Sequence, residues 1–215
     1  MAIAKDNGSR PAAATVTEMT VAFTVSGTNR ILYVGINGDS GASDLTTGVT
    51  YAGVAMTLIT SRRKDADRWQ SFWYLLAPAT GSNNVVITNS SSSYTDPSFV
   101  SLTGVKQQAH EASNTGAVVS GTSLSVSVTT ISPNAWVVGY GGCGVNVASF
   151  GTNTSELDGA TNANFNISIS KATDNPQRVA KSVSLQWTST VNSPFDGTVL
   201  SVAPLGRRVF PIWLS

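Results

Sequence analysis

Apolar and polar residues alternate along most of this chain. Between Thr17 and Val25 the odd positions carry the apolar side chains, namely Met19, Val21, Phe23 and Val25. The same alternation returns in Arg30–Asn37 and from Leu124 to Thr129. A period of two is the pattern of a β-strand with one buried face. These segments therefore predict antiparallel sheets that keep one face in water.

Turn residues separate such runs about every 8–12 positions, and no segment has the apolar spacing of a helix of about ten residues. Ala52–Gly53 is expected to be the two-residue turn of a hairpin, with a positive φ at Gly53. Trp69–Leu76 is the most aromatic strand. Further strands are expected at Val85–Thr88, Phe99–Val105, Ala135–Tyr140, Phe165–Ser170, Val179–Trp187 and Gly197–Val202.

The fold class predicted from these roughly ten to twelve strands is all-β, an antiparallel β-sandwich of jelly-roll type. No fixed-length internal repeat is apparent, which argues against a propeller or a solenoid. We expect one sandwich domain over residues 15–204. Residues 1–14 are expected to be an N-terminal arm and residues 205–215 a C-terminal tail.

The composition narrows the function classes. Only 12% of the residues are charged, and the chain has one histidine and one cysteine. Catalysis and metal binding draw on groups of such side chains, so we expect no enzyme and no cofactor. A net charge of +1 without a basic patch argues against nucleic-acid binding. No apolar run approaches the ~20 residues of a membrane span. The first residues contain no apolar signal-peptide stretch, so we expect synthesis in a host cytoplasm.

Few positions offer candidate chemistry. His110–Glu111 could form a catalytic pair, but no nucleophile accompanies it, and a solvated loop is the better interpretation. Cys143 lies among glycines without the basic setting of a reactive thiol, so a packed core residue is expected. Arg62–Lys64 could meet phosphate, although the neighbouring aspartates favour a solvated loop.

Two sets of loop oxygens could bind Ca²⁺, which takes six to eight oxygen ligands. They are Asn37, Asp39 and Asp44, and Asp158, Asn162 and Asn164. Neither set has EF-hand spacing, and Asp and Asn are common turn formers, so no metal site is predicted.

The aromatic strand offers a surface that could stack on sugars. Alternation places Trp69 and Trp73 on one face and Phe72 and Tyr74 on the other. At least one pair must then belong to the core, where each ring buries ~150–250 Å². Trp69 follows Arg68 and is the better candidate for exposure, and so for contact with a glycan.

The tail is unusually apolar for a chain terminus. It joins two arginines to five large apolar residues, and its members are Arg207, Arg208, Val209, Phe210, Ile212, Trp213 and Leu214. It could be a last strand of its own sandwich, or an arm that buries against a neighbouring subunit. Assemblies held together by such arms are usually symmetric, so a homo-oligomer, with a trimer favoured, is expected.

The order of segments resembles that of β-sandwich structural proteins of tailed bacteriophages. The resemblance rests on NRILYVGINGDSG, GVTYAGVAMTLI, WQSFWYLLAPATGSNNVVIT, FVSLTGVKQ and the closing SVAPLG, and spans Thr17–Pro204. Ala52 stands where the related pattern usually has glycine. The resemblance implies a virion protein without catalytic residues: a capsid decoration protein, a head fibre or a tail adhesin. A carbohydrate-binding adhesin is the alternative, and a glycosidase ranks last because the carboxylates are scattered.

Overall fold

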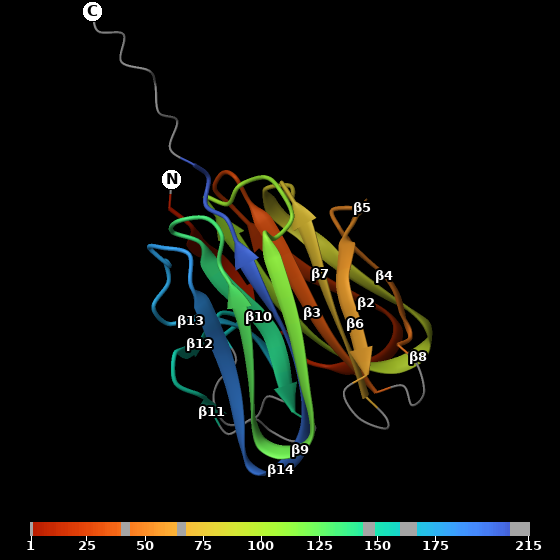
Figure 1. Cartoon of the computed structure of the whole chain (residues 1–215). Coiled ribbons are helices and arrows are strands. Elements are labelled where there is room, and N and C mark those ends of the chain that lie inside the picture. Colours follow the sequence, from red (N-terminus) through yellow and green to blue (C-terminus); the bar gives the residue numbers. More distant parts are fainter. Residues whose placement is uncertain (1, 40–43, 64–67, 144–148, 160–166, 207–215) are drawn as a thin grey trace, which may run out of the picture.

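Fourteen strands and no helix are found in the part of the chain that the computed structural model describes, which is residues 2–39, 44–63, 68–143, 149–159 and 167–206 (Figure 1). The strands form two antiparallel sheets that pack against each other. The predicted all-β antiparallel sandwich is confirmed. The strand number exceeds the expected ten to twelve because several short strands extend the edges.

The first sheet has the central order β5-β4-β8-β3-β7-β6, and both β1 and β2 also pair with β8. Its strands are β1 (Ala4–Ser9), β2 (Ala14–Val25), β3 (Ile31–Asp39), β4 (Thr46–Tyr51), β5 (Val54–Ala55), β6 (Thr57–Arg63), β7 (Arg68–Leu76) and β8 (Gly81–Thr103). Part of the expected N-terminal arm is thus a strand of the sheet. The Ala52–Gly53 turn between β4 and β5 is confirmed, with positive φ at both residues.

The second sheet has the order β11-β14-β10-β13-β12, and β9 also pairs with β14. Its strands are β9 (Ala112–Thr129), β10 (Trp136–Cys143), β11 (Ser149–Phe150), β12 (Thr154–Glu156), β13 (Ile167–Ala172) and β14 (Ser182–Val202). In Figure 1 the long β9 and β14 run together to one end of the molecule and turn there.

Two long strands replace four predicted short ones. Val85–Thr88 and Phe99–Val105 were expected to be separate, but both fall on β8, apart from the last two residues. In the same way β14 joins most of the segments predicted at Val179–Trp187 and Gly197–Val202. The polar residues between them stay extended, and irregular register next to them accommodates the bend. Bulges of this kind increase the bending of a strand, so one strand can serve both sides of a rolled sheet.

Rolling gives the molecule three apolar clusters instead of one. The inter-sheet cluster lies where the sheets face each other, and each sheet encloses a further cluster of its own. Both faces of the central strands are therefore buried: Tyr33 contributes to the inter-sheet cluster and Val34 to the cluster inside the first sheet. All eight residues of β10 are buried. The expectation of one wet face is wrong for these strands, although it holds for Leu124–Thr129.

The two halves of the chain repeat the same strand plan. The order β2-β8-β3-β7-β6 in the first half, residues 2–105, returns as β9-β14-β10-β13-β12 in the second half, residues 106–206. The short strand β4 pairs with β8 as β11 pairs with β14. The first part of β9 occupies the position on β14 that β1 occupies on β8. The topology thus contains an internal repeat, although no fixed-length repeat is apparent in the sequence.

Register shows the repeat at single residues. Ile31 on β3 pairs with Leu102 on β8, as Trp136 on β10 pairs with Val202 on β14. All four side chains belong to the inter-sheet cluster, to which each half contributes seven buried residues. Across the sheets the Phe72 ring stacks between Tyr33 and Tyr140, with centroids 5.4 Å apart on both sides. The sandwich is thus two similar rolled sheets packed through equivalent faces.

Candidate functional site: a pocket at one end of the sandwich

His110 and Glu111, for which a solvated loop was preferred over a catalytic pair, contact different neighbours. Glu111 accepts hydrogen bonds from the Ser132 backbone N–H (3.0 Å) and from the Ser132 hydroxyl. The His110 ring instead meets Tyr74 edge-on, with centroids 6.5 Å apart, and burial lowers its pKa. A general base must reach the proton that it abstracts. His110 packs against Tyr74, and Glu111 holds the turn at Ser132. Both residues therefore have structural roles in place of the solvated loop that was expected.

Cys143 behaves as predicted from its glycine-rich setting. Its side chain is fully buried in the cluster inside the second sheet and forms no disulfide. A buried thiol of this kind contributes to core packing, because a reactive thiolate needs solvent exposure and positive charge nearby.

The described aspartates of the oxygen sets considered for Ca²⁺ both accept hydrogen bonds within the fold. Asp44 accepts from the Thr46 N–H (3.0 Å) and the Ser61 hydroxyl (2.5 Å). Asp158 is buried and accepts from Ser98 (2.5 Å) and Ser168 (2.8 Å), which joins the two sheets. The Asp39 side chain and the whole of Asn162 and Asn164 lie outside the described residues. Across the described chain, no three His, Cys, Asp or Glu side chains come together as a metal site.

The cationic run Arg62–Lys64 also has a structural use at its first residue. The Nε atom of Arg62 donates to both carboxylate oxygens of Asp196, at 2.9 and 2.8 Å, and Gln70 donates to the same carboxylate. Arg62 lies on β6 and Asp196 on β14, so this buried pair links the two sheets. Lys64 and the Arg63 side chain lie outside the described residues.

The aromatic strand β7 divides as alternation predicts. Phe72 packs in the inter-sheet cluster with Tyr74 at its edge, while Trp73 enters the cluster inside the first sheet. The Trp73 indole N–H donates to the Ser71 hydroxyl at 3.0 Å. Trp69 is half-buried near the start of the strand and belongs to none of the clusters. It is the one ring of this strand that lies outside the three core clusters.

Equivalent carboxylates fasten the same turn in both halves. Asp6 accepts from the N–H (2.8 Å) and hydroxyl of Ser26 and from Ser101 (2.7 Å). Burial raises the pKa of Asp6, but these hydrogen bonds and the nearby Arg30 outweigh it and lower the pKa overall. In the second half Glu111 accepts from Ser132 and, at 3.4 Å, from Ser201. We call these two groups the turn clasps.

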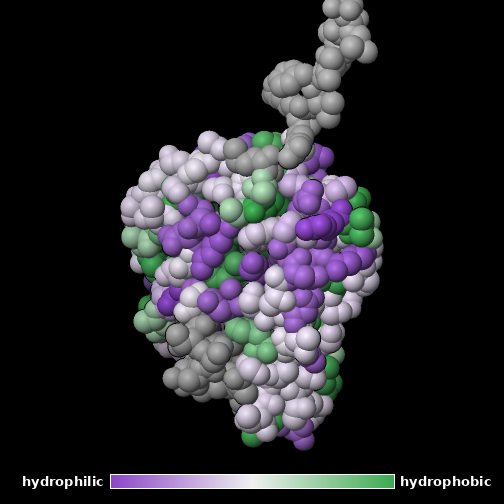
Figure 2. All heavy atoms as spheres, turned by 90° about the vertical axis from the view of Figure 1, so that its left-hand side faces the viewer, coloured by the Kyte–Doolittle hydropathy of each residue, from purple (hydrophilic) through white to green (hydrophobic). Residues whose placement is uncertain are grey.

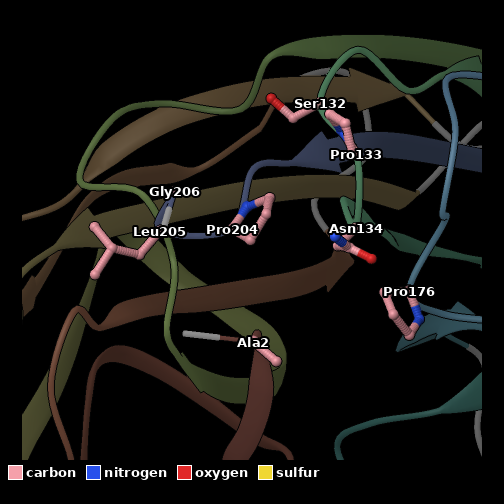
Figure 3. Close-up of a pocket in the computed structure, with 8 residues that line it drawn as sticks. All are labelled: Ala2, Ser132, Pro133, Asn134, Pro176, Pro204, Leu205 and Gly206. Carbon is pink, nitrogen blue, oxygen red and sulfur yellow. The ribbon is translucent and has the colours of Figure 1, made fainter. Parts of the chain in front are cut away.

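Beyond the second clasp the sandwich end opens into a pocket of about 540 Å³. Four segments form it: the chain start, the β9–β10 loop, the loop with the cis Asn175–Pro176 bond, and the stretch after β14 (Figure 3). The lining residues are Ala2, Ser132, Pro133, Asn134, Pro176, Pro204, Leu205 and Gly206. None is charged, and three are prolines. We call this site the end pocket.

The matching place in the first half is bridged by an arginine. The Arg30 side chain donates to the carbonyl oxygens of Pro78 (2.9 Å) and Gly27 (2.6 Å), and so ties the β2–β3 turn to the β7–β8 loop. Register places Ala135 at the equivalent position of the second half. Alanine has no side chain with which to reach across. Backbone hydrogen bonds join the corresponding loops instead, from the Asn134 N–H to the Gln177 carbonyl (2.6 Å) and from the Gln177 N–H to the Ala135 carbonyl (2.9 Å).

Exposed apolar side chains stand on the same loops. Ile131, next to the pocket residue Ser132, is 61% exposed, and Val179 on the β13–β14 loop is 66% exposed. Figure 2 shows a different distribution over the broad face that it presents, where hydrophilic residues dominate the middle and apolar ones form small separate patches. In the described part of the chain, no helix is long and apolar enough to cross a membrane.

The tail residues singled out from the sequence, 207–215, lie outside the described residues. The structure describes the tail only to Gly206, which is itself part of the pocket wall. Sequence reasoning missed the end pocket, because its lining comes from four separate stretches of chain. The cluster of Pro133, Pro176 and Pro204 is visible only after folding.

Comparison with known proteins adds little. No family model matches this chain, and no curated protein matches it. Among solved structures it is similar to the major capsid protein P2 from Bacteriophage PM2, with 9% identity, over 97% of this chain and all of the other. The TM-score is 0.28, and a likeness this low shows neither kinship nor a shared role.

Proposed function

We propose that this protein is a non-enzymatic structural protein of a bacteriophage virion, of the capsid decoration or head-fibre kind. The observation that carries the proposal is the end pocket. It is an apolar, uncharged recess at the point where the described chain stops. Recesses of this composition suit packing against another protein segment better than chemistry on a substrate.

The use of the polar side chains supports the same proposal. The buried carboxylates of the described chain, those of Asp96, Asp158 and Asp196, all hold parts of the fold together. The segment order that resembles tailed-phage sandwich proteins points in the same direction. The partners would be capsid or tail proteins and further copies of this chain, with a trimer favoured.

The direct test is to locate the protein on particles. Antibodies raised against the full chain should decorate virus particles from its source, and the protein should co-purify with them in a fixed ratio to the main capsid protein. Particles that lack it should still form but lose resistance to heat or low salt, as expected of a decoration protein. Exclusion from purified particles would contradict the proposal.

A carbohydrate-binding adhesin is the second candidate, favoured by the half-buried Trp69 at the start of β7. A ring with one open face can stack on a sugar. The full chain would be tested on a glycan array beside Trp69→Ala, with Tyr94→Ala as a control at another exposed ring. Binding that is lost in Trp69→Ala alone would favour the adhesin. Equal signals for all three proteins, or none, would count against it.

A further inference from the structure

The chemistry of the end pocket selects an apolar occupant. Its lining contains no charged side chain, and one of its two polar residues, Ser132, already gives its hydroxyl proton to Glu111. An ion or a strongly polar ligand would lose its water without gaining partners. Its volume lies within the ~300–1,000 Å³ of typical binding pockets, which is room for large side chains.

The chain itself supplies such a segment at the pocket rim. Gly206 forms part of the wall, and the next nine residues are RRVFPIWLS. Val209–Leu214 contains five large apolar residues, among them Phe210 and Trp213. Each aromatic ring buries ~150–250 Å² when it is enclosed, and aromatic anchors in pockets dominate interface energies.

We propose that the end pocket binds the segment Val209–Leu214 of a second copy of this chain. The inference rests on the assembly role proposed above and gives that role a site. Only Arg207 and Arg208 separate the segment from Gly206 in the pocket wall, so they would be the whole connection if the segment entered its own pocket. That would hold two adjacent guanidinium groups at the mouth of an apolar recess, where they lose hydration.

A segment that arrives from a neighbour has no such restriction. Its arginines can remain in water while the apolar residues fill the pocket and cover Ile131 and Val179. The contact joins the tail of one copy to the pocket of the next, so it is heterologous. Contacts of this type close into rings when the rotation between copies allows it.

Gly206→Trp offers a clean way to block the pocket in the full-length protein. A Cβ built on Gly206 meets no atom within 4 Å and its φ is not in the left-handed region, so a tryptophan there adds a large ring to the pocket wall without backbone strain. Gly48→Trp is the matched control, because Gly48 on β4 is equally open and lies outside the pocket lining. Light scattering after size exclusion would measure the mass of each protein over a range of concentrations.

We expect the wild type and Gly48→Trp to self-associate, and Gly206→Trp to require at least about tenfold higher concentration for the same mass. Phe210→Ala together with Trp213→Ala should weaken association to a similar extent, because it removes the anchors instead of the recess. A wild type that stays monomeric, or a Gly206→Trp protein that associates normally, would overturn the inference.

Cross-linking distinguishes a second copy from the same chain. One chain would carry Ala2→Cys in the pocket wall and another, with a different tag, Ser215→Cys; the native Cys143 is buried and serves as the unreactive background. A short thiol cross-linker should join the two tagged chains when they are co-expressed. If a chain with both cysteines gives only internal links, the tail occupies its own pocket and the inference is wrong.

These results separate the inference from the function on which it rests. A protein that decorates particles but remains monomeric with an empty pocket would keep the virion role and lose the tail-in-pocket contact. A protein absent from particles that still associates through the pocket would lose the role alone.

Discussion

The first and second halves of this protein share a framework and differ at one end. Both place a long bent strand, β8 or β14, between equivalent neighbours, and both fasten a turn with a carboxylate clasp. At the end of the first half Arg30 spans two loops, while the second half has Ala135 there and the end pocket beside it. The shared parts build the fold. The end pocket lies where the halves differ, with most of its lining from the second half and Ala2 from the first, and is therefore the better place to look for function.

The halves also differ inside their rolled sheets. In the second half Trp187 lies against Gly141 and Gly197, where added Cβ atoms would come within 2.9 and 2.8 Å of its ring. Register places Ile87 at the position of Trp187 in the first half, with Ile36 and Pro97 opposite it. The second half fills this space with one large side chain against two glycines. The first half fills the equivalent space with three side chains of medium size. The same strand plan therefore tolerates different core chemistry when total volume is kept.

The largest effect should come from the ion pair between the sheets, in which Asp196 is fully buried and Arg62 is 32% exposed. Asp196→Ala leaves the Arg62 guanidinium and the buried Gln70 amide without their acceptor. Loss of these three hydrogen bonds to one charged group is expected to lower the free energy of unfolding by about 3–5 kcal/mol. The equivalent change Asp96→Ala removes a pair with Arg10 that lies within the first half, so we expect a smaller loss. Urea denaturation measures both. Equal losses of unfolding free energy in the two variants would mean that an ion pair between the sheets stabilises the fold no more than one within a half.

The exchange of core sizes can be tested in the same way. Trp187→Ala should lower stability by about 3–5 kcal/mol through the cavity that it leaves. Adding Gly141→Ile to Trp187→Ile imitates the first half and should recover part of the loss of Trp187→Ile alone. A double variant no more stable than the single one would show that the two cores are not interchangeable.

Removal of either turn clasp should have a moderate effect. Asp6→Ala and Glu111→Ala each lose hydrogen bonds to a charged acceptor, for which about 1–3 kcal/mol is expected. The folded pKa of Asp6 lies below the ordinary 3.8 of an aspartate. Its contribution is therefore complete above that value and is lost as the pH falls through the folded pKa. Unfolding measured between pH 7 and 2 should show this acid-dependent loss in the wild type and less of it in Asp6→Ala.

Arg30→Ala would give the first half the alanine that the second half has at this position. It removes two hydrogen bonds to carbonyl oxygens and should lower stability by about 1 kcal/mol. If the arginine is what closes this end, the variant should bind more of an apolar fluorescent dye than the wild type. Unchanged dye binding would show that the neighbouring loops close the end without Arg30.

The smallest effect concerns His110, which lies between the halves. Burial holds its pKa below the ordinary 6.5, so the folded state favours the neutral ring. The unfolded chain binds the proton more readily, and stability should fall as the pH drops from 6.5 through the folded pKa. His110→Gln should remove this slope, which thermal unfolding between pH 7.5 and 5 would measure. An identical slope in the variant would assign it to another group.

Strands with clean alternation could be predicted from local sequence. Leu124–Thr129 has the predicted inward and outward faces, and the strand predicted at Trp69–Leu76 differs from the observed β7 by only one residue. The continuity of β8 could not be predicted, because Asn89 and Ser93 in its bend are residues that normally signal a loop. Asn89 is held there by hydrogen bonds to the Val16 carbonyl and to Thr95. Such partners become neighbours only when the sheet rolls.

The all-β fold class could be predicted from the sequence, because alternation along the strands requires buried sheets. The scarcity of His, Cys and acidic residues argued against a catalytic site. That the two halves of the chain share one strand plan became visible only in the tertiary structure. The few matched positions, such as Ser101 with Ser201 or Asp96 with Asp196, are too sparse to reveal a repeat. The tertiary structure also decided where the end pocket lies. Backbone pairing depends on strand geometry and tolerates many side chains, whereas a recess depends on which distant loops meet.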